Sequence, residues 1–540
     1  MDQAASVALP PQPPVGTNAV HEKLNKPPNK IGIVIFGLIL IGGFGYAFSQ
    51  LANDLSGTHL ASVWPYVLLG TALLIALGFE FVNGFHDTAN AVATVIYTHT
   101  LEPHIAVVWS GMWNLIGVLT SSGAVAYTIV SLLPVELVLQ VGKGAGFAMV
   151  FALLIAAIIW NLSTWWLGLP ASSSHTLIGS IIGVGIANQL MNVSSGTSGV
   201  DWGQALGVFK ALLFSPVVGF IFSALLLLLL KVLVKKPELY ESPKGDAPPP
   251  WWIRGLLVLT CTGVSFGHGS NDGQKGMGLI MLILIGTVPT AYALNHAVGA
   301  SQVQDFVAVS DEAANVLSKY VSPDAVMGDA RNDLTDYIRT KQFTSNTMLA
   351  ARQMMVEIRD EATAYKTLAA IPANQQQNVR NDMYVMSEAL RLMAKSGNPK
   401  FSPEQNAVLA NYKKHLDLST KFIPPWVKVA VALALGMGTM IGWKRIVVTV
   451  GEKIGKEHLT YAQGASAEII AAITIIAADQ YHLPVSTTHI LSSGVAGTML
   501  ANGSGLQFAT IRNIALAWVL TLPAAALLAA GIFWTLRQFI

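Results

Sequence analysis

Apolar runs long enough to cross a lipid bilayer recur along most of this chain. A membrane-spanning helix needs about 20 consecutive apolar residues, yet only 11% of the 540 residues here are charged. A soluble chain of ordinary composition has about 25% charged residues, so much of this chain has no water to face. We predict an all-α polytopic membrane protein with about ten to twelve transmembrane helices, some of them re-entrant or broken.

Nearly half of the charged side chains lie in one segment. Residues Ser301–Lys421 hold 14 acidic and 14 basic side chains and show helical spacing, which indicates a soluble insertion. The predicted organisation is a disordered Pro-rich N-terminus (1–30), a first membrane half (31–234) with an extra N-terminal span (31–51), a linker (235–250), the start of a second membrane half (251–300), the soluble helical insertion (301–423) and the rest of the second half (424–540).

Lysines flank both the first apolar run and the linker. Lys23, Lys26 and Lys30 precede the first run, and Lys235 and Lys236 open the linker. Short cytoplasmic segments of membrane proteins are enriched in Lys and Arg, so we predict that the N-terminus and the linker are cytoplasmic. Long insertions do not follow this rule, and the side of residues 301–423 stays open.

The composition and motifs argue against several classes of protein. The formal charge is only +2 and no basic cluster of the kind that binds nucleic acid is present. The single cysteine, Cys261, lies in an apolar run and cannot form an internal disulfide. No His-Glu-x-x-His motif occurs. A Ser or Thr beside a His on one helix does not face it, which disfavours a membrane-embedded hydrolase.

Two motifs occur once in each half of the chain. Pro170-Ala-Ser-Ser-Ser-His175 is matched by Pro484-Val-Ser-Thr-Thr-His489. Asn83-Gly-Phe-His-Asp-Thr-Ala-Asn90 is matched by His268-Gly-Ser-Asn-Asp-Gly-Gln-Lys275, so that Gly84 aligns with Gly269 and Asp87 with Asp272. Each half therefore presents the Asp motif first and the Ser/Thr motif later. Matched interruptions in two halves indicate a duplicated transporter with its site at the repeat interface.

The Ser/Thr motifs are typical of helix N-termini that bind an anion. A proline followed by hydroxyl residues before an apolar run predicts a helix start, where free backbone N–H groups and the helix dipole favour an oxyanion. Plain helix capping, or hydroxyls bonding within a span, is the alternative for one copy alone. The candidate anion-binding hydroxyls are Ser172, Ser173, Ser174, Ser486, Thr487 and Thr488.

The Asp motifs are candidate ion-coupling sites. A charged side chain at membrane depth costs at least about 2.5–3.5 kcal/mol, so Asp87 and Asp272 need a function. We expect Gly84 and Gly269 to let the helix break there. Asp87 is followed at i+3 by Asn90, whereas Asp272 is followed at i+3 by Lys275.

That difference favours protons over sodium as the coupling ion. Lys275 can supply beside Asp272 the positive charge that a bound cation would otherwise supply. The alternative is a lysine at a helix end that reaches the headgroups. Further candidates for ion coupling are Asn271, and Glu80 and His86 as proton relays.

At these four motifs the chain resembles the Pit-type inorganic phosphate transporters, and within them the bacterial low-affinity, proton-coupled permeases. The resemblance is carried by residues 83–94, 169–179, 270–276 and 484–489 and covers the chain from about Trp64 onward. It implies two inverted repeats with helical hairpins and a central phosphate site. It also implies that phosphate contacts the six hydroxyls and Asn90, and that Asp87, Asp272 and, imperfectly, Lys275 take the coupling positions.

The resulting expectation is a phosphate symporter of the inner membrane with no catalytic residues, no resident metal and no cofactor. A proton is the expected driving ion, and co-transport of magnesium or another divalent metal with phosphate stays open. A sodium-coupled symporter is the main alternative, while a channel and a membrane hydrolase fit the paired motifs less well. The expected partners are phosphate and the bilayer, not nucleic acid, and monomer and homodimer both stay open.

Overall fold

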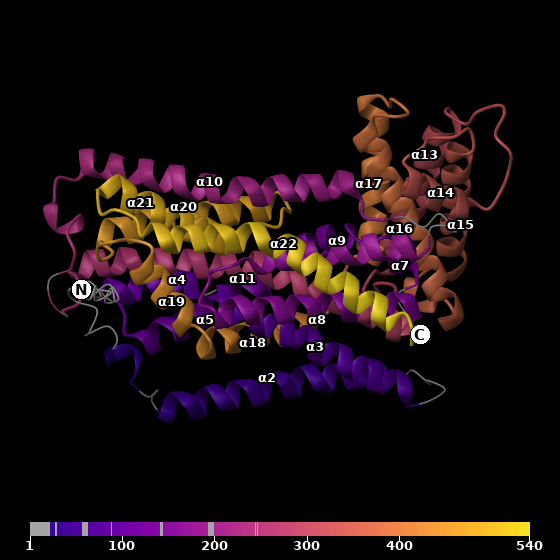
Figure 1. Ribbon diagram of the computed structural model, residues 1–540. Helices are drawn as coiled ribbons and strands as arrows, with labels where there is room; N and C mark the ends of the chain where they lie inside the picture. Colours follow the sequence, from indigo (N-terminus) through magenta and orange to yellow (C-terminus); the bar gives the residue numbers. More distant parts are fainter. Residues whose placement is uncertain are drawn as a thin grey trace, which may run out of the picture.

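The chain folds as a long helical body with a helical bundle at one end (Figure 1). The computed structural model describes residues 22–26, 30–56, 63–87, 89–140, 144–192, 199–243, 245 and 247–539, without the side chains of 89 and 90. The predicted disordered segment, 1–30, therefore lies mostly outside the described residues. Apart from one isolated bridge between Gly455 and Leu506, these ranges hold no β-structure.

The helices of the body and of the bundle have the following bounds. The first half contains α2 (Lys30–Ser56), α3 (Trp64–Asp87), α4 (Ala89–Tyr97), α5 (Pro103–Thr120), α6 (Ala124–Val130), α7 (Val135–Leu139), α8 (Gly144–Trp166), α9 (Ser173–Met191) and α10 (Trp202–Leu233). The second half contains α11 (Trp251–Thr287), α12 (Pro289–Tyr292), α18 (Pro425–Ile441), α19 (Lys444–Val448), α20 (Tyr461–Gln480), α21 (Thr487–Asn502) and α22 (Phe508–Leu536). Between α12 and α18 lie α13 (Ala300–Ser318), α14 (Ala330–Thr340), α15 (Thr347–Tyr365), α16 (Ala373–Ser396) and α17 (Pro403–Thr420).

The all-helical membrane fold is confirmed. Six helices in the described ranges are long and apolar enough to cross a bilayer, or up to eight if each of two bent pairs is one span. The bends lie between α5 and α6, at 77°, and between α17 and α18, at 73°. By length and composition alone this is fewer than the ten to twelve expected. The long helix α11 lies outside the six because its buried middle is the polar Asp motif.

The two halves have matching helices that exchange partners. In chain order, α3, α5, α8, α9 and α10 correspond to α11, α18, α20, α21 and α22. Helix α9 packs on α22 of the other half, and α21 packs on α10; likewise α5 packs on α11, and α18 on α3. Each half therefore completes the core of the other.

Glycines at equivalent positions allow these exchanged contacts. A Cβ at Gly84 would overlap the Leu435 carbonyl oxygen, and a Cβ at Gly269 would overlap that of Asn114. The expectation that these glycines break the helix is wrong for Gly269, because α11 continues unbroken through it, and for Gly84, because α3 continues to Asp87. Their physical role is close helix–helix approach, for which only glycine leaves room.

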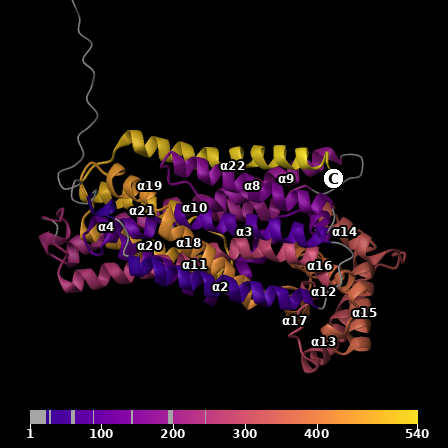
Figure 2. The same ribbon diagram turned by 90° about the horizontal axis from the view of Figure 1, so that it is seen from below.

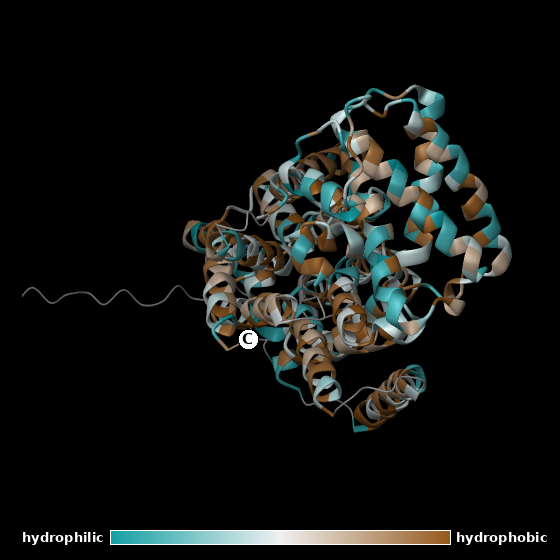
Figure 3. Cartoon of the chain, turned by 90° about the vertical axis from the view of Figure 1, so that its right-hand side faces the viewer, coloured by the Kyte–Doolittle hydropathy of each residue, from teal (hydrophilic) through white to brown (hydrophobic). Residues whose placement is uncertain are grey.

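The bundle of α13–α17 packs at one end of the body, while the linker and the first described residues lie at the other (Figures 1 and 2). Hydrophobic and hydrophilic residues alternate around the helices of this bundle, as expected for helices with one face in water (Figure 3). Helix α2 lies at the side of the body, and Ala47 is its one buried residue. Its far end reaches the bundle side, where Asp54 accepts hydrogen bonds from Tyr292 and Trp426.

Candidate functional site

The two Ser/Thr motifs meet at the centre of the body, each as the start of a helix. Ser172 and Ser486 are the N-caps of α9 and α21, and their hydroxyls accept the backbone N–H groups of His175 and His489. The predicted helix starts are therefore confirmed. Ser174 Oγ donates to the carbonyl oxygen of Val485 at 2.8 Å, which joins the motif of one half to that of the other.

Hydroxyls from both halves hold the carboxylate of Asp87. Ser173 Oγ donates to one carboxylate oxygen at 2.6 Å, and Thr488 Oγ1 donates to the other at 2.7 Å. His86 Nδ1 lies 3.0 Å from the same oxygen as Thr488, and its Nε2 lies 3.1 Å from the hydroxyl of Thr164. All of these side chains are buried. A carboxylate thus occupies a set of donors that would suit any oxyanion.

The second Asp motif has a cation beside its carboxylate. Lys275 Nζ lies 2.8 Å from Asp272 Oδ1, and both side chains are buried. The same ammonium group donates to Ser174 Oγ at 2.5 Å and to the Val485 carbonyl at 3.3 Å. Lys275 does not extend to the headgroups, which was the alternative interpretation. It instead links the Asp motif of the second half to the point where the Ser/Thr motifs meet.

His268 brings the two Asp motifs together, a role that the sequence analysis missed. One carboxylate oxygen each of Asp87 and Asp272 and one ring nitrogen of His268 lie within 4.8 Å of one another. His268 Nε2 is 3.8 Å from Asp272 Oδ2, and His268 Nδ1 is 2.6 Å from Asn114 Oδ1. The available signal was its position four residues before Asp272, on the same helix face. Two carboxylates and an imidazole are suitable ligands for a small cation, although Lys275 already balances one of the two charges.

The other predicted residues surround this centre at different distances. Asn271 Nδ2 donates to the Leu483 carbonyl at 3.0 Å and so anchors the segment before Ser486. Glu80 lies against Gly276, which follows Lys275 on α11, and it accepts a hydrogen bond from Asn83 at 3.4 Å. Thr487 Oγ1 is buried and has no hydrogen-bond partner in the described part of the chain. The side chain of the remaining prediction, Asn90, lies outside the described residues.

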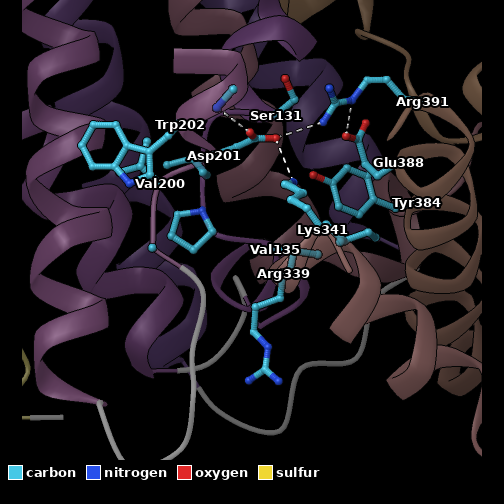
Figure 4. A pocket seen from close by; sticks show the side chains of 15 residues that line it. Ser131, Val135, Val200, Asp201, Trp202, Arg339, Lys341, Tyr384, Glu388 and Arg391 are labelled. Carbon is cyan, nitrogen blue, oxygen red and sulfur yellow. Dashed lines mark hydrogen bonds and ion pairs between the residues drawn. The ribbon is translucent and has the colours of Figure 1, made fainter. Parts of the chain in front are cut away.

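A separate polar cluster fastens the bundle to the body (Figure 4). Asp201 caps the start of α10 and pairs with Lys341 at 3.1 Å and with Arg391 at 3.3 Å, and Arg391 also pairs with Glu388 at 2.7 Å. Burial raises the pKa of Asp201, but Lys341, Arg391 and the Gln204 N–H outweigh burial, so the pKa of that carboxyl is lowered. The adjoining cavity of about 210 Å³ has its charges paired, as in a docking contact.

Known proteins are similar to this chain over most of its length. Residues 83–529 match the phosphate transporter family, PHO4. The low-affinity inorganic phosphate transporter PitA of Escherichia coli (strain K12) is 42% identical over 491 residues, which cover 88% of this chain and 97% of that protein. The low-affinity inorganic phosphate transporter PitB of the same organism is 40% identical over 495 residues, covering 88% and 98%.

A more distant relative and a solved structure also match. A probable low-affinity inorganic phosphate transporter of Bacillus subtilis (strain 168) is 28% identical over 475 residues, covering 87% of this chain and 98% of that protein. A sodium-dependent phosphate transporter of known structure aligns over 88% of this chain with a TM-score of 0.48 and 18% identity. These relatives are named as transporters, not as enzymes. Because the family match spans 83–529 and the PitA identity spans nearly the whole of both chains, this protein belongs to the phosphate transporter family.

Proposed function

We propose that this multi-pass membrane protein is a secondary active symporter that carries inorganic phosphate across the cytoplasmic membrane, driven by protons. The names of its relatives support phosphate as the substrate. One observation carries the mechanism: Ser173 of one half and Thr488 of the other donate to the two oxygens of Asp87. Neutral hydroxyls bind an anion without holding it permanently, as a transporter requires.

Competition between two anions for the same donors can couple proton and phosphate. While Asp87 is ionised, its carboxylate occupies the hydroxyls of Ser173 and Thr488 and repels a second anion at close range. Protonation removes that charge and frees both hydroxyls for the oxygens of phosphate. His86, in contact with both Asp87 and Thr164, is the group best placed to pass the proton.

Lys275 favours protons over sodium in the second half. Its ammonium group already neutralises Asp272 and reaches Ser174, where the anion would bind. A sodium ion at Asp272 would have to displace the ammonium group or bind beside it, at a cost in electrostatic repulsion.

Thr487 Oγ1, buried without a partner among the described residues, is a hydroxyl that could donate a hydrogen bond to the substrate. A complex of phosphate with a divalent metal is a second form of the substrate to test, because Asp87, His268 and Asp272 are suitable ligands for the metal.

The test is phosphate uptake into proteoliposomes in which the pH gradient, sodium and magnesium are varied independently. We expect an imposed inward proton gradient, without sodium, to drive phosphate above its external concentration and to raise internal proton concentration. A need for sodium with no internal acidification would replace proton coupling by the sodium alternative. Equilibration without accumulation would indicate a channel. Magnesium that moves inward with phosphate in a fixed ratio would support the metal complex.

A further inference from the structure

A second cavity, of about 620 Å³, lies between the bundle and the body and differs in charge from that in Figure 4. Four cationic side chains and two acidic ones line it, a net charge of +2. Lys413 and Lys421 share Asp417, at 2.5 and 2.9 Å, and Arg391 pairs with Glu388. The charged lining residues are Arg391, Lys413, Lys414, Lys421, Glu388 and Asp417.

Lys414 carries one of the two unbalanced charges, and the other arises because Lys413 and Lys421 share one carboxylate. The Lys414 side chain is exposed, and no acid within the described ranges forms an ion pair with it, whereas its neighbour Lys413 is paired. An excess of one sign of charge around a cleft concentrates counter-ions and speeds their association. The cavity therefore has the charge and the volume to collect small anions from solution.

Two segments that line this cavity continue along the chain to residues that contact the central site. His482 lines it, and Ser486 follows four residues later, a stretch that spans at most about 14 Å. The same segment contains Leu483, whose carbonyl accepts from Asn271. The bend between α5 and α6 also lines the cavity, and next to it the Val125 N–H donates to Oε1 of Gln274, which precedes Lys275 in sequence.

The distribution of lysine and arginine assigns this cavity to the outer side of the membrane. Several cationic side chains lie at the far end of the body. Lys444 donates to Asn25, and Arg254 donates to the Thr100 carbonyl. Lys231 lies over the ring of Tyr240 in the linker, and Lys236 lies over the ring of Trp252 in α11. The short segments Ser121–Gly123 and Ser131–Pro134, at the bundle end, contain no Lys or Arg. Short basic segments are cytoplasmic, so the bundle, at the opposite end, faces outward (Figure 1).

We propose that this cavity is an outward-facing vestibule that binds the incoming oxyanion and delivers it past His482 to the Ser/Thr motifs. The proposal rests on the proposed function, since phosphate is taken as the anion. It gives the insertion a role in substrate capture: α16, α17 and Lys421, which directly follows α17, supply every charged group of the vestibule.

The first test measures phosphate uptake kinetics in right-side-out vesicles. Lys414→Glu should raise the KM for phosphate roughly three- to tenfold at low ionic strength with kcat unchanged, and Lys414→Gln should raise it less. About 0.5 M salt should remove the difference by screening. Lys400→Glu is the matched control, because it makes the same change of charge on an exposed residue of the bundle outside the cavity. An unchanged KM, or an equal effect of Lys400→Glu, would overturn the vestibule.

The second test determines the side of the membrane independently of transport. The natural Cys261 is buried, so Lys414→Cys introduces an accessible thiol. A membrane-impermeant maleimide should label it in intact right-side-out vesicles, and labelling only after lysis would overturn the assignment. Wild-type vesicles that accumulate no phosphate would refute the proposed function, whereas normal wild-type uptake with an unchanged KM in Lys414→Glu would refute the vestibule alone.

Discussion

In the first half, Asp87 ends a helix and is held by two hydroxyls and an imidazole. In the second half, the equivalent Asp272 lies inside the unbroken α11 and is paired with Lys275. The helices around the two residues match and exchange partners in the same way. Duplication has thus kept the scaffold symmetric while the chemistry diverged: hydroxyls and an imidazole surround one carboxylate, and an ammonium group lies beside the other.

The largest expected effect is the loss of transport when the carboxylate of the first half, Asp87, is replaced. Asp87→Asn should abolish proton-coupled uptake, at least about a hundredfold, because the amide carries no exchangeable charge but keeps the shape. Uptake by purified variants in proteoliposomes measures the loss, and thermal stability serves as the control, since an Asn side chain can still accept from one of the two hydroxyls and donate its N–H to the other. Asp272→Asn should also stop uptake. Normal coupled uptake in either variant would remove that residue from the mechanism.

Replacing Asp272 or Lys275, the buried ion pair of the second half, should lower the stability of the protein, unlike the replacement of Asp87 by Asn. Removing one partner of a buried ion pair costs about 3–5 kcal/mol, whereas replacing both by neutral groups costs far less. Asp272→Asn and Lys275→Met should therefore each lower the Tm in detergent strongly, and the double variant should recover most of the loss. Additive losses in this double-mutant cycle would mean that Lys275 does not serve as the counter-charge.

The shared scaffold should respond alike in both halves. Gly84→Ala and Gly269→Ala should each destabilise the protein by about 1–3 kcal/mol, because the added methyl group meets a backbone carbonyl of a neighbouring helix. Gly70→Ala and Gly255→Ala are matched controls in the same two helices, with open space around the added group. A large loss in only one half would show that the scaffold is less symmetric than its contacts indicate.

Ser173 and Thr487 occupy equivalent positions in the two Ser/Thr motifs, and their Ala variants should differ in the kinetics of uptake. Thr487 has no partner among the described residues, so Thr487→Ala should raise the KM for phosphate roughly tenfold, the value of one charge-assisted hydrogen bond, with the Tm unchanged. Ser173→Ala should raise the KM and also shift the pH dependence of uptake, because it removes a donor to Asp87. An unchanged KM in the double variant would exclude both hydroxyls from the phosphate site.

The smallest effect concerns the polar cluster of Asp201, Lys341, Arg391 and Glu388, which fastens the bundle to the start of α10. Asp201 caps α10, whereas the residue before α22, Gln507, makes no side-chain cap. The pKa of Asp201 is lowered in the folded protein, so its contribution to stability is present above its unfolded pKa and lost as pH falls through the folded value. Asp201→Asn should keep the cap, lose the ion pairs and weaken this acid dependence, at a cost of about 1 kcal/mol. If the Tm of this variant falls with pH as it does in the wild type, the ion pairs of Asp201 do not contribute to stability.

Local features of the site could be predicted from the sequence, and its long-range pairings could not. The caps Ser172 and Ser486 follow from a local helix-start signal, and the pairing of Lys275 with Asp272 follows from their i+3 spacing. Which hydroxyls reach Asp87 could not be predicted, because Ser173 and Thr488 occupy different positions of the two motifs and depend on how α9 and α21 meet. The glycines were misinterpreted because a break and a close helix contact give the same signal.

The exchange of partners between the halves also has a consequence for how such a protein can be assembled. Helix α9 packs most extensively on α22 of the other half, and α21 packs most extensively on α10, so neither half contains a complete fold. A chain cut within the linker should yield two fragments that are degraded when made singly and that associate when made together. A half-length ancestor of this architecture would have had to insert in both orientations and fold as an antiparallel pair of identical chains.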